Sequence, residues 1–229
     1  MITVAIHQPC YFPWLGYLHK MANCDVFVFL DTAVRSKSDY VNRVQIKNSG
    51  GVQWLTIPLQ KAEHEIPINR IGTEVGEKDG RFLNIWQIKH WHLIEAAYRK
   101  TPYWDEYKEF IKCFYYDYHR TLDAVTIQSV SLLRGFFNIG CGMFCASDLD
   151  IPDVTGSERN LEICKALNAD KYLSGVGGRD YNDTGSFLSA GIEIMYSDFQ
   201  HPYYPQRGEF VEGLSSLDYL FNVGGKYEW

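Results

Sequence analysis

This chain of 229 residues lacks the features of nucleic-acid-binding and membrane-spanning proteins. It has no run of Lys or Arg longer than two, and its formal net charge is −6. Binding to duplex nucleic acid needs clustered cations, so a duplex partner is not expected. No apolar stretch approaches the roughly 18 residues of a membrane helix. Because Met1 to His7 reads as a short apolar strand and not as a signal peptide, we expect a cytoplasmic protein without a membrane span.

The cysteine pattern indicates neither a disulfide framework nor a metal site. The six cysteines include no CxxC pair, and free thiols suit a reducing cytosol. The spacing of Cys141 and Cys145 is wrong for a zinc knuckle, so no metal is expected. The sequence identifies no cofactor.

Composition is that of a globular protein, with 46% hydrophobic and 22% charged residues. The length favours one compact domain over residues 1–229, because there is no repeat or linker. A helical subdomain is predicted within it at approximately residues 80–138. Aromatic residues reach 15%, and we expect some of them to line a cleft.

The hydrophobic patterns predict an α/β fold with a mostly parallel sheet flanked by helices and a central helical insertion. Strands are expected at 2–6, 25–30, 143–146, 171–173 and 192–196, with a hairpin at 40–47 and 52–59 and a short strand near 66–71. Helices are expected at 14–23, 81–100, 104–118, 122–137 and 187–190. A capping box at Thr155 and Glu158 predicts a helix to Leu167, and Ser215 is read as the N-cap of a last helix.

Ligands of open α/β sheets bind beyond the carboxyl ends of the strands. That rule selects the segment from His7 to Tyr17, then Asp31, then the segment from Ser174 to Tyr181. His7 is the best candidate for a catalytic residue, because its near-neutral pKa allows general acid or base work. The structural alternative is a His that orders the following proline-rich turn. Cys10 is read as structural, since no second motif supports a Cys–His couple.

The glycine cluster at Gly175, Gly177 and Gly178 resembles a phosphate-binding loop, in which missing side chains let the backbone approach oxygens. Arg179 follows it, and a guanidinium can grip phosphate or carboxylate in two places. The alternative is a tight turn with a surface Arg. The remaining candidates for substrate binding are polar or aromatic residues along the chain, namely Gln8, Tyr11, Trp14, Lys20, Asn42, Arg43, Lys89, His90, Ser174, His201, Tyr204 and Gln206.

These segments, taken in order, resemble the WbqC-like family. The opening IHQPCYFPWLGYLHKMANCDVFVFLD is similar to the start of that family, although Cys10 stands where the pattern often has Asn. The similarity continues through Asn42-Arg43, Trp54 to Pro58, Lys89-His90, Tyr172 to Gly175, Gly177 to Arg179, His201-Pro202, Tyr204 to Gln206, Ser215 to Asp218 and Phe221 to Gly224.

The resemblance implies a role in bacterial surface-polysaccharide (O-antigen type) biosynthesis. A small-molecule substrate, a nucleotide-linked and often amino sugar, is then expected, and an acyl or aminoacyl transferase would fit such a pathway. Two alternatives stay open. The strand, His-bearing turn and helix distantly resemble a nucleotidyltransferase, and the chain can also be a sugar-nucleotide-binding protein without catalysis.

Overall fold

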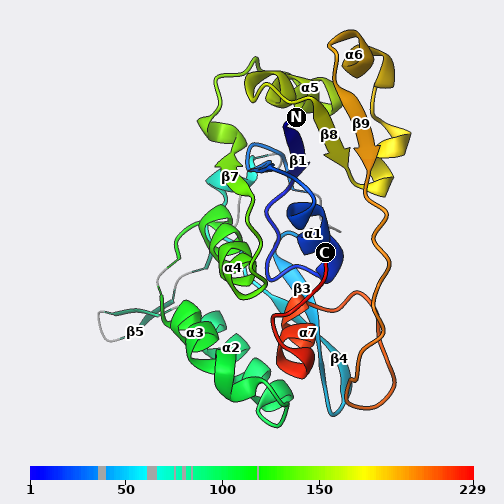
Figure 1. The fold of residues 1–229 in the computed structure, drawn as a ribbon. Helices are drawn as coiled ribbons and strands as arrows, with labels where there is room; N and C mark the ends of the chain where they lie inside the picture. Colours follow the sequence, from blue (N-terminus) through cyan, green and yellow to red (C-terminus); the bar gives the residue numbers. More distant parts are fainter. Residues whose placement is uncertain (36–39, 61–65, 75, 79–80, 84, 118) are drawn as a thin grey trace.

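The computed structural model describes residues 1–35, 40–60, 66–74, 76–78, 81–83, 85–117 and 119–229. Its centre is a five-stranded sheet in the order β7-β2-β1-β8-β9, in which every neighbouring pair is parallel (Figure 1). The strands are β1 Thr3–His7, β2 Val26–Phe29, β7 Gly142–Cys145, β8 Lys171–Ser174 and β9 Glu193–Tyr196. The predicted α/β class with a parallel sheet is confirmed.

Both faces of the sheet are covered, which explains why its strands are apolar runs. Side chains alternate across a strand, so Val4 and Ile6 of β1 belong to one buried cluster and Ala5 belongs to the other. The first cluster is completed by residues of α5 (Gly156–Ala166) and α6 (Thr184–Ser189), and the second includes α1 (Leu15–Ala22).

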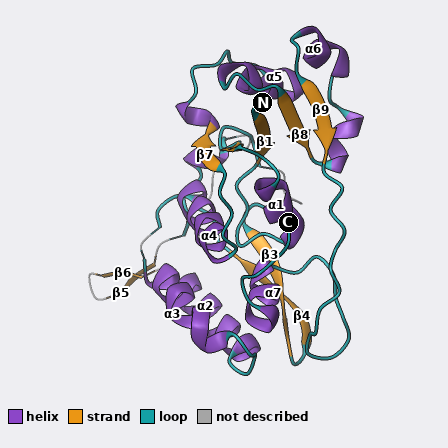
Figure 2. Cartoon of the chain, viewed as in Figure 1, coloured by secondary structure: helices purple, strands orange, loops and turns teal. Residues whose placement is uncertain are grey.

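An insertion that contains the predicted helical region lies between β2 and β7, which are neighbours in the sheet although far apart in sequence. It holds the helices α2 Ile85–Tyr98, α3 Trp104–Tyr116 and α4 Leu122–Phe136, the hairpins β3 Arg43–Asn48 with β4 Gly51–Thr56 and β5 Gly76–Lys78 with β6 Arg81–Leu83, and the short 3-10 helix η1 Ile68–Arg70. Together with α7 (Ser216–Val223), α2 and α3 lie at the end of the molecule away from α5 and α6 (Figure 2). Their buried residues belong to the same cluster as those of α1.

Local expectations were met with exceptions. The hairpin at 43–56 is confirmed, and Gly51 has a φ of 112°, a conformation that favours glycine. The strand near 66–71 is wrong, because the backbone forms η1 there. The helix predicted from Arg81 begins at Ile85, since residues 81–83 pair with β5 instead. Thr155 is the N-cap of α5 without the predicted side-chain cap, whereas the Ser215 hydroxyl does cap α7.

The order of the strands creates a crevice between β1 and β8. The chain leaves β1 toward α1, on one face of the sheet, and leaves β8 toward α6, on the other face. Short 3-10 helices follow β7 and β8, namely η2 Ala146–Asp148 and η3 Val176–Asp180. Where connections from neighbouring parallel strands diverge to opposite faces, their carboxyl ends leave room for a ligand.

None of the helices that the structure describes combines the length and the apolar character needed to cross a bilayer. All six cysteines lie within the described residues, and none forms a disulfide.

Candidate functional site

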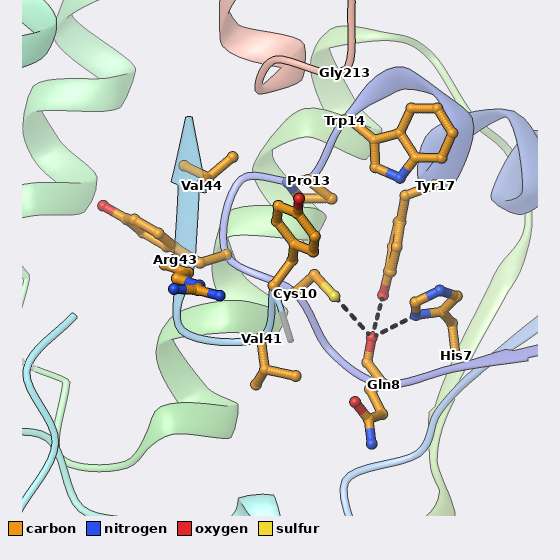
Figure 3. A pocket seen from close by; sticks show the side chains of 12 residues that line it. His7, Gln8, Cys10, Pro13, Trp14, Tyr17, Val41, Arg43, Val44 and Gly213 are labelled. Carbon is orange, nitrogen blue, oxygen red and sulfur yellow. Dashed lines mark hydrogen bonds between the residues drawn. The ribbon is translucent and has the colours of Figure 1, made fainter. Parts of the chain in front are cut away.

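A cavity of about 480 Å³ opens beyond the carboxyl end of β1. Its wall is mostly apolar and aromatic and carries a few polar groups, the usual make-up of a small-molecule site. It is lined by His7, Gln8, Cys10, Tyr11, Pro13, Trp14, Tyr17, Tyr40, Val41, Arg43, Val44 and Gly213 (Figure 3). Because β1, the following loop, α1 and β3 all contribute, the insertion builds one side of the cavity.

The loop between β1 and α1 is held in place by hydrogen bonds from distant elements. Phe12 has a φ of 38°, which is unusual for a residue with a bulky side chain. Its N–H donates to Ser129 Oγ on α4 at 3.0 Å, and its carbonyl accepts from Ser215 Oγ at 2.7 Å. The Tyr11 N–H donates to the Val41 carbonyl at 3.0 Å. The wall is therefore fixed before any ligand arrives.

The Gln8 carbonyl fixes the tautomer of His7. It lies 3.0 Å from His7 Nδ1, and it also accepts hydrogen bonds from the Tyr17 hydroxyl at 3.2 Å and the Cys10 thiol at 3.5 Å (Figure 3). A carbonyl oxygen only accepts, so the ring proton resides on Nδ1 and Nε2 carries the lone pair. Among the described residues no hydrogen-bond partner is found for Nε2. This nitrogen is available to accept a proton from a ligand.

The His7 ring is neutral at neutral pH. Burial lowers its pKa to about 4, the charge of Lys20 acts in the same direction, and the hydrogen bond to Gln8 partly opposes both. The ring also lies edge-on to Tyr17, with 4.7 Å between the ring centroids. A neutral imidazole with a free Nε2 is the form that general base catalysis requires.

The Tyr11 hydroxyl belongs to a buried chain of hydrogen-bonded polar groups. The Tyr11 hydroxyl bonds to the Tyr115 hydroxyl and lies 3.0 Å from His90 Nδ1, while the His90 ring also hydrogen-bonds the backbone of Thr56. Burial lowers the pKa of His90 to about 3, so it stays neutral. The Tyr11 hydroxyl is thus engaged in hydrogen bonds within the protein.

A second cavity of about 300 Å³ adjoins the first and lies in the crevice between β1 and β8. His7, Trp14 and Tyr17 line both cavities. The rest of its wall comes from α1, from the turn after β8 and from the segment after β9, namely Gly16, Lys20, Gly175, Val176, Gly177, Ser197 and Phe199. Two compartments therefore meet at a His, a Trp and a Tyr.

Comparisons with known proteins identify the family of this chain. The model of the WbqC-like protein family matches residues 8–227, which is nearly the whole chain. The chain belongs to the WbqC-like family. It is also 29% identical to an uncharacterized protein of Mycobacterium tuberculosis, over 99% of this chain and 96% of that protein. No solved structure showed a significant match.

In this WbqC-like protein the two cavities gather eight of the residues that the sequence indicated. His7, Gln8, Tyr11, Trp14 and Arg43 line the first cavity, and His7, Trp14, Lys20, Gly175 and Gly177 line the second. The Arg43 guanidinium lies 4.8 Å from the centroid of the Trp54 ring. The binding roles of these residues remain predictions.

Other candidates lie outside both walls and make structural contacts. Asp31 is buried after β2 and accepts hydrogen bonds from the Ser147 N–H and from Asn69, which ties β2 to the segment after β7. Asn42 donates to the Ile57 carbonyl at 2.9 Å. Lys89 is exposed on α2, and His90 is buried in contact with Tyr11 and the backbone of Thr56.

In the turn after β8, the candidates Ser174, Gly178 and Arg179 also lie outside both cavity walls. Ser174 is buried and accepts a hydrogen bond from Asn182 at 3.0 Å. Gly178 is packed against both side chains, because a Cβ there would lie 2.1 Å from Ser174 Oγ. Arg179 is exposed, and its guanidinium lies 4.4 Å from the centroid of the Tyr196 ring instead of reaching either cavity.

The candidates near the C-terminus organise the segment before α7. The Tyr204 hydroxyl donates to Asp218 at 2.9 Å, Gln206 bonds the backbone of Val211, and the His201 ring stacks on the Tyr204 ring. Asp218 is buried and also accepts from Tyr98. These contacts hold together the part of the chain that supplies Ser215 to the loop after β1.

Several wall residues were not among the sequence candidates. Ser197 and Phe199 follow β9, so the rule about carboxyl ends, applied to the last strand as well, would have found them. Tyr17, in the first turn of α1, ends the segment that the same rule selected but was not singled out within it. Gly213 carries no signal in the sequence that would have placed it at the cavity.

Proposed function

We propose that this protein is a cytoplasmic transferase of bacterial surface-polysaccharide biosynthesis, which moves an acyl or aminoacyl group onto a nucleotide-linked amino sugar. The observation that carries the proposal is the free Nε2 of a neutral His7 where two cavities meet. Two joined compartments suit a reaction that brings a donor and an acceptor together. Family membership supports the pathway, and the aromatic wall supports a ligand with a ring.

The reaction requires a proton acceptor in the position that His7 occupies. The nitrogen of the sugar amine attacks the acyl carbon of an activated donor such as a thioester, and a C–N bond forms. His7 Nε2 accepts the proton that this nitrogen loses. The tetrahedral intermediate then expels the thiolate, and the His7 imidazolium returns the proton to it. The Nδ1 hydrogen bond to Gln8 holds the ring in place and stabilises the imidazolium that forms transiently.

The proposal is tested with the substitution His7→Asn. The amide nitrogen of Asn occupies nearly the place of Nδ1 and keeps the bond to Gln8, but no group replaces Nε2. Turnover of a nucleoside-diphosphate amino sugar with an acyl thioester should fall by about 10²–10⁴-fold. Affinity for the sugar nucleotide should change little. The assay measures released thiol, and mass spectrometry identifies the acylated sugar.

The matched control is His92→Asn, which removes an exposed His of α2 that lines neither cavity. It should retain wild-type turnover. Equal activity of the His7 variant and the wild type would remove His7 from the mechanism. Release of pyrophosphate from a nucleoside triphosphate, without acyl transfer, would favour a nucleotidyltransferase instead, and tight binding with no turnover would favour a binding protein.

A further inference from the structure

The second cavity contains a buried positive charge that the protein does not neutralise. Lys20 is only 4% exposed, and its ammonium donates one hydrogen bond, to the Ile6 carbonyl at 2.7 Å. An ammonium has three N–H donors. Within the described part of the chain no carboxylate forms an ion pair with Lys20. A buried charge normally has a charged partner, because losing water around it is costly.

The ammonium is the main form of Lys20 at neutral pH. Burial lowers its pKa to about 8, while the nearby thiols of Cys24 and Cys164 act in the opposite direction. At pH 7 the cavity wall therefore carries a positive charge in most molecules. An anionic ligand group is the partner that the charge lacks.

The turn opposite Lys20 leaves space where such a group can approach. Gly175 and Gly177 line the cavity, and a Cβ built on either meets no atom within 4 Å. Neither has the left-handed φ that favours glycine. Packing thus explains Gly178, whereas neither packing nor backbone conformation explains Gly175 and Gly177. What those glycines provide is access to the main chain.

Trp14 forms the border between the two compartments. Its ring lies against Gly16 at the start of α1, where an added Cβ would come within 2.4 Å of a ring carbon. It is edge-on to Phe199, with 5.3 Å between the ring centroids, and it remains 43% exposed. A half-exposed aromatic face at a border can stack on a ring whose charged substituent continues into the next compartment.

We propose that the second cavity is a phosphate subsite, in which the Lys20 ammonium pairs with a phosphate that also contacts the main chain at Gly175 and Gly177. The ring-bearing part of the same ligand then lies in the first cavity, past Trp14. That this phosphate belongs to a nucleotide-linked sugar rests on the proposed function, whereas the subsite itself does not. Arg179, which stacks on Tyr196, takes no part.

Occupation of the subsite changes the basicity of His7. The positive charge of Lys20 is one of the two causes that lower the pKa of His7. A phosphate beside Lys20 offsets that charge, so the pKa of His7 rises when the phosphate is bound. His7 is then a stronger proton acceptor with substrate in place than without it.

The test uses inorganic pyrophosphate and the full chain. Calorimetry measures its affinity for the wild type and for Lys20→Met, in which an uncharged side chain of similar length replaces the ammonium. NMR follows the His7 ring through a pH titration with and without pyrophosphate. The Lys20 variant should bind at least roughly tenfold more weakly, because it loses a charge-assisted contact. The pKa of His7 should rise on binding in the wild type only.

Lys100→Met is the control, since Lys100 is exposed after α2 and the variant has the same net charge as Lys20→Met. It should bind pyrophosphate like the wild type. Should Lys20→Met not fold, the wild type alone still decides, because pyrophosphate must shift the resonances of His7 and of the Gly175 and Gly177 amides.

Three results overturn the subsite: no binding by the wild type, equal binding by Lys20→Met, or shifts confined to other parts of the protein. Each of them can occur whether or not acyl transfer is observed. Conversely, Lys20-dependent binding without acyl transfer supports the subsite and contradicts the proposed function.

Discussion

The turn after β8 permits a stability prediction in which two adjacent glycines behave differently. In Gly178→Ala the new Cβ would lie 2.1 Å from Ser174 Oγ and 2.7 Å from Asn182 Nδ2. These two atoms form a 3.0 Å hydrogen bond, and Ser174 is buried. The clash therefore forces Asn182 away from Ser174, which is buried and has little room to move. In Gly177→Ala the added methyl group meets no atom within 4 Å.

The magnitudes follow from the two surroundings. Overpacking of a buried site costs about 1–3 kcal/mol, and loss of the hydrogen bond adds about 1 kcal/mol. Gly178→Ala should thus lower the free energy of unfolding by about 2–4 kcal/mol, a Tm decrease of roughly 5–15 °C for a chain of this size. Gly177→Ala should change it by less than about 0.5 kcal/mol, or stabilise slightly through the unfolded state.

Urea unfolding followed by tryptophan fluorescence measures both variants against the wild type. The reasoning fails if the two substitutions destabilise equally, or if Gly178→Ala is neutral. Asn182→Ala is a useful comparison, because it removes one partner of the hydrogen bond without a clash. Its cost should be smaller than that of Gly178→Ala.

Four further expectations concern charge, pH and cooperativity. The pKa of Lys20 is lowered from 10.5 to about 8 in the folded protein, so the unfolded chain binds more protons between these pH values. The free energy of unfolding of the wild type, relative to that of Lys20→Met, should therefore rise by roughly 3 kcal/mol from pH 8 to 10.5. A difference that stays constant with pH in urea unfolding would contradict this. The pKa of His90 is lowered to about 3, so the wild type should lose stability as the pH falls from 6.5 toward 3, and His90→Gln should lose less over that range in thermal unfolding monitored by circular dichroism. Ser129→Ala removes the acceptor of the Phe12 N–H and should lower the free energy of unfolding in urea by about 1–3 kcal/mol. It should also weaken the binding of a sugar nucleotide measured by calorimetry, whereas an unchanged affinity would show that α4 does not influence the site. Because α1 to α4 and α7 share one buried cluster, circular dichroism and fluorescence should report a single coincident unfolding transition; an early separate loss of helix would instead favour an independent subdomain over residues 80–138.

The regular elements could be predicted because their signals are local. The run from Ile2 to Ile6 is apolar on both faces, and the strand it predicts is buried on both faces. The hairpin at 43–56 follows from a glycine-rich link between two short segments in which polar and apolar residues alternate. The predicted boundaries were wrong where a few residues fit both the helical and the strand pattern of apolar positions. Phe82 and Ile85 fit a helical spacing, yet residues 81–83 pair with β5, and the Asp-Gly pair that precedes them in the sequence is a hairpin signal.

Neighbours in the sheet could not be predicted, and they decide the site. The sequence shows that His7 and Ser174 each follow a strand, but it does not show that β1 and β8 are adjacent. This adjacency joins two strands that are separated by 163 residues, from residue 8 to residue 170. The same limitation explains why His201, Tyr204 and Arg179 appeared to be ligands. The polar residues that hold distant segments together are of the same types as the residues that bind substrates, so the sequence does not distinguish them.

The residues that line the cavities depend on other polar residues that hold the lining segments in place. The residues that line the cavities come from β1, α1, β3 and the turns after β8 and β9, whereas the polar residues outside the walls hold those segments against one another. Ser129 and Ser215 reach the loop after β1 from α4 and from the N-cap of α7, and Asp218 holds Tyr98 and Tyr204. Because the φ of Phe12 is strained, the loop keeps its shape only while these contacts persist. Substitutions in the segment from His201 to Asp218 should therefore alter turnover by changing the position of His7, although only Gly213 of that segment lines the first cavity.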